Sequence, residues 1–190
     1  MRWNIATPVA VCLAIAVSCG GGGTSGSPIP EDPGGSTNLA GGFTPEEANP
    51  GDGTVAMALG AASGNLVTIE VNVTGVDNLF SADFNVTYDP QRAEFVNWSA
   101  GTILETGGNS PSYFLTATQP GTITVGATRT GGGSGGVDVG SSQTLIHLVF
   151  RVTEVGSSTL AFEQAALLDA QDLPQQIPGL SWYGGTLTGN

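Results

Sequence analysis

The chain has 190 residues and a mass of 19.1 kDa, which is room for one domain of ordinary size. It contains 30 glycines and 11 prolines but no lysine, and 16 acidic residues against four arginines give a formal net charge of −12. The glycine, proline and β-branched content favours strands and turns and argues against an all-helical bundle. Because nucleic acids and anionic bilayers attract Lys and Arg, the charge predicts no nucleic acid partner and no direct binding to a membrane surface.

The first residues predict an export signal. Arg2 precedes an apolar run at residues 5–17 that is broken only by Thr7 and Pro8, and this run is too short to span a bilayer. Small residues then lead to Cys19, a pattern that resembles the lipobox of bacterial lipoproteins. The resemblance implies a signal peptide at 1–18, lipidation of Cys19, and a domain held outside the cytoplasm on a cell-envelope membrane. Ordinary cleavage nearby, with Cys19 left as a free thiol, is the alternative.

Residues 19–52 predict a lipid-anchored flexible linker. They are rich in Gly, Pro and Ser, carry five acids, and offer almost nothing apolar to bury. The folded domain is therefore expected at residues 53–190.

From residue 54 onward, apolar and polar residues alternate. Residues 66–74 place Val67, Ile69, Val71 and Val73 on one side and only polar residues between them, as in a half-buried strand. Turn signals separate nine such segments, and no amphipathic helix of useful length intervenes. The predicted fold is an all-β, antiparallel β-sandwich of nine strands, at residues 55–59, 66–74, 80–88, 92–98, 113–117, 122–128, 145–152, 158–162 and 182–187.

Four segments, in this order, resemble a cohesin domain. They are the strand pair at 71–76 and 80–90, the apolar strand at 145–152, the stretch from 158–160 to 166–169, and the closing residues 184–187. The resemblance implies a jelly-roll sandwich that is not an enzyme and needs no cofactor. It also implies that one outer sheet face binds a dockerin, a small calcium-loaded module on another protein, in extracellular assemblies that degrade polysaccharides.

The resemblance and the alternation together indicate which residues bind the partner. The family's third-strand contact positions fall on Ser81 and Asp83, and alternation places Asn85 and Thr87 in the same outward row. Such hydroxyl, amide and carboxylate groups suit hydrogen bonds to a partner, and Asp83 can pair with Lys or Arg. By the same resemblance, later strands would add Thr116, Thr118, Thr122, Thr124, Thr128 and Glu163. A solvated strand face with no partner is the alternative for every residue in this row.

The sequence offers little for catalysis or metal binding. His147 is the only histidine, and its place within an alternating strand predicts a surface position. Residues 131–136 match the G-x-G-x-x-G pattern, but residues 137–141 after them read as more loop and not as the helix that a dinucleotide site requires. Acidic and amide side chains in turns leave calcium open, but no EF-hand loop is present and turn chemistry explains them equally well: Asp77, Asn78, Asp89, Asp169 and Asp172.

Two other functions compete with protein binding. A carbohydrate-binding module shares the same sandwich architecture and would stack sugar rings on exposed aromatic side chains. In this alternative the ligand is a polysaccharide. Its candidate platforms are Trp98, Tyr113, Phe114, Trp182 and Tyr183. A structural or adhesive surface domain without any dockerin partner is the second rival.

Overall fold

The computed structural model describes residues 39–130 and 135–190, which belong to one compact unit at Thr37–Asn190. The predicted signal peptide and Cys19 lie outside the described residues. The described residues form one short 3-10 helix, η1 (Ile103–Glu105), and twelve strands: β1 (Gly41–Pro45), β2 (Thr54–Ser63), β3 (Leu66–Thr74), β4 (Val76–Thr87), β5 (Ala93–Ala100), β6 (Ser112–Gln119), β7 (Thr122–Thr128), β8 (Val137–Val139), β9 (Gln143–Val152), β10 (Gly156–Asp169), β11 (Ser181–Tyr183) and β12 (Gly185–Gly189). No helix in the described part is long and apolar enough to cross a membrane.

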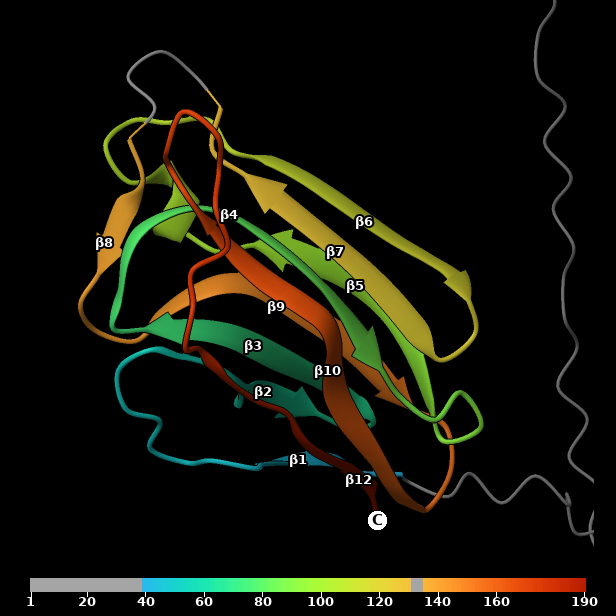
Figure 1. The fold of residues 1–190 in the computed structure, drawn as a ribbon. Coiled ribbons are helices and arrows are strands. Elements are labelled where there is room, and N and C mark those ends of the chain that lie inside the picture. Colours follow the sequence, from blue (N-terminus) through green and yellow to red (C-terminus); the bar gives the residue numbers. More distant parts are fainter. Residues whose placement is uncertain (1–38, 131–134) are drawn as a thin grey trace, which may run out of the picture. The chain divides into compact units, whose positions relative to one another are not determined.

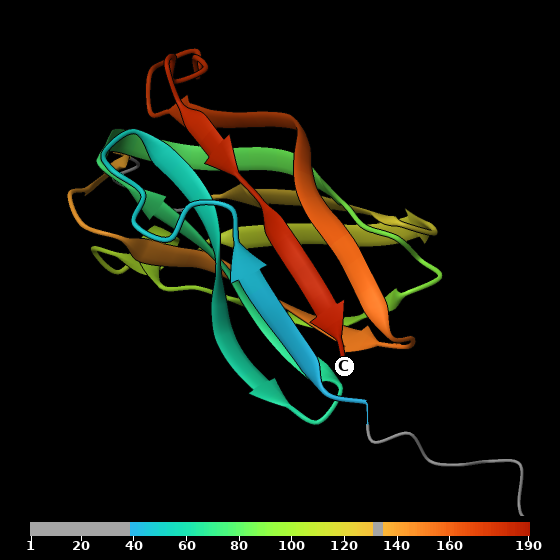
Figure 2. The same ribbon diagram turned by 90° about the horizontal axis from the view of Figure 1, so that it is seen from below.

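The strands form two sheets that pack as two layers (Figure 1). Seven strands make one sheet in the order β1-β12-β10-β4-β7-β6, with β8 paired to the start of β4. Five strands make the other in the order β11-β2-β3-β9-β5. Figure 2 shows how β12, in red, lies between β1 and β10. The prediction of an all-β sandwich is confirmed.

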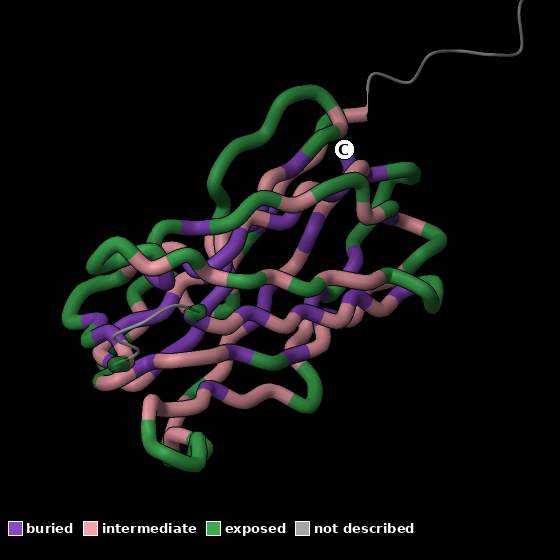
Figure 3. The backbone as a smooth tube through the Cα atoms, turned by 90° about the horizontal axis from the view of Figure 1, so that it is seen from above, coloured by how far each residue is buried: buried purple, intermediate pink, exposed green. Residues whose placement is uncertain are grey.

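The core lies between the two sheets and is built from the inward residue of each alternating pair. Phe84 of β4 and Phe150 of β9 enter it from opposite layers, and neither has any exposed surface. Figure 3 shows the resulting alternation of buried and more exposed segments along the strands. Burial of each such large apolar side chain contributes roughly 1.5–3 kcal/mol to stability, so the period-two pattern is what selects this packing.

A Pro-Gly turn fixes the register of the β6–β7 hairpin. Gln119 and Thr122 face each other across it, and Gly121 has φ +83°, a conformation that favours glycine. The Gly121 carbonyl also accepts a hydrogen bond from the Tyr88 amide at 2.9 Å. This turn holds β6 beside β7, and therefore sets which side chains share their outer face.

The predicted count of nine antiparallel strands is wrong in three places. β1 and β8 were not expected, and the single strand predicted at 182–187 is two strands, β11 and β12, that belong to different sheets. The split occurs at Gly184, where an added Cβ would lie 2.0 Å from the Leu160 carbonyl oxygen. In addition, β11 pairs with β2 in parallel, so the sandwich is not antiparallel throughout.

The boundary predicted at residue 53 is also too late, and residues 137–139 are not loop. β1 lies inside the predicted linker and pairs with β12. Its Phe43 side chain is only 7% exposed, and this burial holds the strand against the domain. Val137 and Val139 are both buried and form β8, which is too short for its alternation to be distinctive.

Candidate partner-binding face

The side chains of β10, β4, β7 and β6 that point away from the core form one continuous surface, which we call the outer face. Along β4, Ser81, Asn85 and Thr87 are half-buried and Asp83 is exposed, while the residues between them are buried. The structure therefore places the predicted row on one side of one strand. Asp83 has neither a hydrogen bond nor an ion pair from its side chain among the described residues.

Strand pairing brings the other predicted residues to the same face. On β7, Thr122, Thr124 and Thr128 lie opposite Thr87, Asn85 and Ser81. On β6, Thr116 lies opposite Thr124, and on β10 Glu163 lies opposite Asn85. Residues paired across adjacent strands point to the same side of a sheet, so these predicted positions share one surface.

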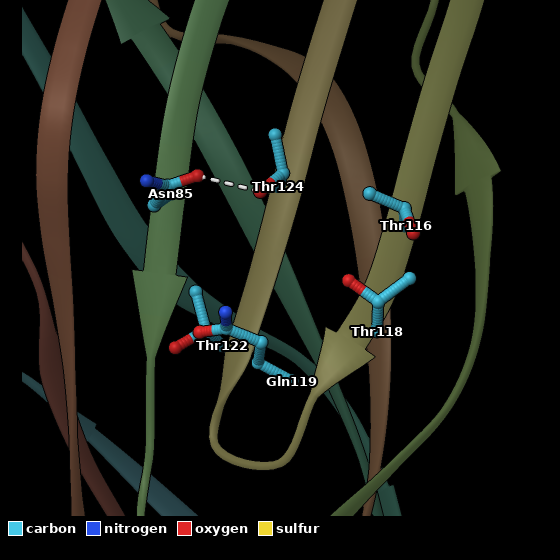
Figure 4. A pocket seen from close by; sticks show the side chains of 6 residues that line it. All are labelled: Asn85, Thr116, Thr118, Gln119, Thr122 and Thr124. Carbon is cyan, nitrogen blue, oxygen red and sulfur yellow. Dashed lines mark hydrogen bonds between the residues drawn. The ribbon is translucent and has the colours of Figure 1, made fainter.

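One half of the outer face is polar and partly locked by its own hydrogen bonds (Figure 4). The Thr124 hydroxyl donates to Asn85 Oδ1 at 2.8 Å. Asn85 Nδ2 then donates to Gln164 Oε1 at 3.2 Å. Asn85 and Thr124 line a shallow hollow together with Thr116, Thr118, Gln119 and Thr122. Thr118, which was also predicted, lines this hollow too, beyond an irregularity in the β6 register.

The other half of the outer face contains apolar residues that sequence reasoning did not assign to protein binding, beside the predicted Ser81 and Asp83. Phe114 lies opposite Gly126, Gly126 lies opposite Asp83, and Asp83 lies opposite Ala166. Leu168 lies one step further along β10, opposite Ser81. A second hollow is lined by Phe114, Gly126, Leu168 and Asp83 with their neighbours. Phe114 lies two residues before Thr116 on β6, so strand alternation puts both on the same side. This spacing was the signal that could have placed Phe114 here.

The aromatic residues proposed as sugar platforms mostly pack inside. Trp182 lies against Phe162 and Phe84, with ring centroids 5.1 and 6.0 Å apart. Trp98 packs against Tyr113 at 5.6 Å, and Tyr183 is half-buried. Phe114 is the one member of that set with most of its surface accessible, at 63% exposed. The five aromatics therefore do not form a platform together.

His147 lies where the alternation predicts, half-buried on the outward side of β9. Its Nδ1 is 3.9 Å from Glu70 Oε1 on β3, on the sheet that does not carry the outer face. Within residues 39–130 and 135–190, no three or more His, Cys, Asp or Glu side chains gather as they would around a metal ion.

Two acids that could have bound calcium are engaged in turns. Asp89 Oδ1 accepts a hydrogen bond from the Gln91 amide at 2.9 Å. Asp169 accepts one from the Gln175 amide at 3.0 Å, and this bond, aided by Gln171 and only partly opposed by desolvation, lowers the pKa of the Asp169 carboxyl. Both carboxylates thus order the chain after a strand.

A family model, the cohesin domain, matches residues 54–179. The chain belongs to the cohesin family. Its sheets resemble solved cohesins, including the second type II cohesin module of the adaptor scaffoldin ScaA from Acetivibrio cellulolyticus (TM-score 0.57, 16% identity, covering 74% of this chain and 91% of that one). The seventh type I cohesin of ScaB from Pseudobacteroides cellulosolvens gives a TM-score of 0.56 at 20% identity, covering 70% and 88%.

A mutant type II cohesin–X-dockerin complex from A. cellulolyticus also matches, with a TM-score of 0.55 at 16% identity, covering 68% of this chain and 92% of that one. At these identities the solved structures establish a shared fold only. No curated protein matches the sequence significantly.

Proposed function

We propose that this cohesin binds a dockerin-bearing protein through the outer face. The observation that carries the proposal is that four adjacent strands of a cohesin present accessible hydroxyl, amide and carboxylate groups on one surface. One of the similar solved structures is a cohesin in complex with a dockerin. A sheet face of this kind suits a protein partner, because its polar groups form specific hydrogen bonds while its apolar part supplies desolvation.

The charge of the outer face supports a basic partner surface. All charged residues of β4, β6, β7 and β10 are acidic: Asp77, Asp83, Glu163 and Asp169. Asp83 and Glu163, which lie in the predicted set, are both exposed. The described arginines lie elsewhere: Arg129 is buried, Arg92 precedes β5, and Arg151 is on β9. Complementary Lys or Arg side chains on the partner would speed its association and fix its orientation.

The finer parts of the proposal concern topology, chemistry and location. The sandwich is of the jelly-roll type and acts without catalysing a reaction. A lipid on Cys19, after the apolar run at 5–17, tethers the domain outside the cytoplasm to a cell-envelope membrane. The dockerin partners belong to an assembly that acts on polysaccharides. What supports this part is the lipobox resemblance and the family resemblance.

The test is direct binding with a charge-reversal variant. The protein is titrated in a calorimeter against each dockerin module encoded in the same genome. Asp83→Arg should abolish binding while the thermal unfolding midpoint stays unchanged, because Asp83 is exposed and has no partner within the described part of the chain. Glu154→Arg, the same charge change at an exposed residue after β9, is the matched control and should bind normally. Failure of every dockerin to bind the unmodified protein would overturn the proposal.

A further inference from the structure

The apolar half of the outer face is a hollow with a defined floor and walls. Phe114, 63% exposed, forms one wall on β6, and Leu168 forms another on β10. Gly126 of β7 lies on the floor, and an added Cβ there would have only ordinary contacts, 3.9 Å to Phe114 Cβ and 4.0 Å to the Phe114 carbonyl oxygen. The space above Gly126 is therefore open because this residue has no side chain, and Phe114 does not fill it.

A β-bulge completes this hollow. β10 gains one residue relative to β4 between Glu163 and Ala166, and Gln164 adopts φ +48° at this point. Beyond the bulge, Ala166 and Leu168 point to the outer face while Leu167 is fully buried. The small Ala166 and the larger Leu168 thus extend the line of Phe114 and Gly126 across four strands.

The two halves of the outer face differ in what they can gain from a partner. Asn85 already uses its oxygen on Thr124 and its nitrogen on Gln164, and exchanging such bonds, or bonds to water, yields little net free energy. The hollow, by contrast, exposes apolar surface whose removal from water is favourable in proportion to its area. Interfaces commonly concentrate their binding energy where one anchor fills such a hollow.

Resting on the proposed function, we propose that the hollow between Phe114 and Leu168 is the anchor site of this cohesin. Its occupant is one apolar side chain of the dockerin, with a Lys or Arg beside it. Charge complementarity supports this choice, because Asp83 lines the same hollow and its carboxylate has no partner among residues 39–130 and 135–190. The polar half then serves orientation and contributes less affinity.

Two opposite variants test the anchor with the dockerin modules encoded in the same genome. Phe114→Ala removes a wall, and Gly126→Val fills the floor. Each variant should lower the affinity for the dockerin that binds the unmodified protein by ~30-fold or more. Val155→Ala, which truncates another exposed apolar side chain (62% exposed) between β9 and β10 and outside the outer face, is the matched control and should change affinity by less than ~3-fold. Gly126 lies in a strand, which suits valine, and a Cβ added there would clash with no neighbour. Gly126→Val should therefore keep the fold even if Phe114→Ala does not.

The outcomes separate the two proposals. If the unmodified protein binds a dockerin and both variants bind it normally, the anchor site is wrong while the proposed function stands. If no dockerin binds, the proposed function itself is wrong. Titration with cellohexaose and xylohexaose covers the sugar alternative: binding of either that Phe114→Ala abolishes would make the hollow a sugar subsite and overturn the anchor.

Discussion

The Thr124 hydroxyl donates a hydrogen bond to Asn85 Oδ1 at 2.8 Å, between two residues that face each other directly across β4 and β7. Because Asn85 Nδ2 also donates to Gln164 on β10, the amide of Asn85 has one defined orientation. Three neighbouring strands are linked through their side chains on a surface where water competes for every polar group. This link gives the polar half of the outer face a fixed arrangement before any partner arrives.

Thr124→Val tests that link. Valine keeps the β-branched shape but removes the donor, so the free energy of unfolding should fall by about 1 kcal/mol. Thr122→Val is the matched control, because Thr122 lies in the same row of β7 and its hydroxyl has no hydrogen bond within the described residues; it should be nearly neutral. Urea unfolding of both variants measures the difference. Equal stabilities for the two would mean that the Thr124–Asn85 bond contributes nothing.

The alternation of residues 81–87 on β4 and of residues on β7 was enough to predict the outward row, because the pairing of these two segments is regular from Ser81–Thr128 to Thr87–Thr122. β10 differs. Continued period-two alternation from Glu163 would turn residues 165 and 167 outward, but the bulge at Gln164 reverses the phase and turns Ala166 and Leu168 outward. The left-handed backbone of Gln164 (φ +48°) has no sequence signal, since non-glycine residues adopt it rarely. The outward positions of Ala166 and Leu168 therefore could not be predicted from the sequence, whereas that of Phe114 could.

The strand at 182–187 was wrongly predicted as one unit for a related reason. Its residues suit a strand throughout, but the chain passes from one sheet to the other at Gly184, and only tertiary contact reveals the change. Glycine is required there by the close approach of the Leu160 backbone. In sequence, such a glycine cannot be told from one in a turn.

Gly184→Ala tests this crossing. An alanine Cβ would lie 2.0 Å from the Leu160 carbonyl oxygen, and because that oxygen belongs to the backbone, β10 would have to shift. We expect a loss of about 3 kcal/mol in the free energy of unfolding. Gly140→Ala is the control, since nothing lies within 4 Å of its added Cβ, and it should change stability by less than about 0.5 kcal/mol. Similar chemical-denaturation curves for both variants would contradict the crossing constraint.

Arg129 is a buried cation that ties down the end of η1. It is 6% exposed, and its guanidinium donates to the Leu104 carbonyl at 3.2 Å and to the Thr106 carbonyl at 2.9 Å. No carboxylate among the described residues lies within 4 Å of it. Arg129→Lys should lower the free energy of unfolding by about 2 kcal/mol, because an ammonium keeps the buried charge but loses the planar fork that spans two carbonyls.

Two further variants distinguish this role from charge alone. Arg129→Met removes the charge together with the donors, and it should destabilise the protein no more than Arg129→Lys does. Arg151→Lys, at the exposed pair with Glu94, should change stability by less than about 1 kcal/mol. If Arg129→Lys were as mild as Arg151→Lys, the two carbonyl bonds would not matter to the fold.

Tyr113 gives the fold a defined sensitivity to alkaline pH. Burial, assisted by the negative charge of Glu105, raises the pKa of its phenol from 10.0 to about 12, and the hydroxyl donates to the Leu145 carbonyl at 3.2 Å. Folding thus favours the protonated phenol. Its contribution to stability is complete below pH 10 and is lost as the pH rises from the unfolded pKa through about 12. Tyr113→Phe should remove the latest component of the phenolate absorbance titration, and its stability deficit should shrink over that pH range. Loss of a component at the ordinary tyrosine pKa instead would contradict the assignment.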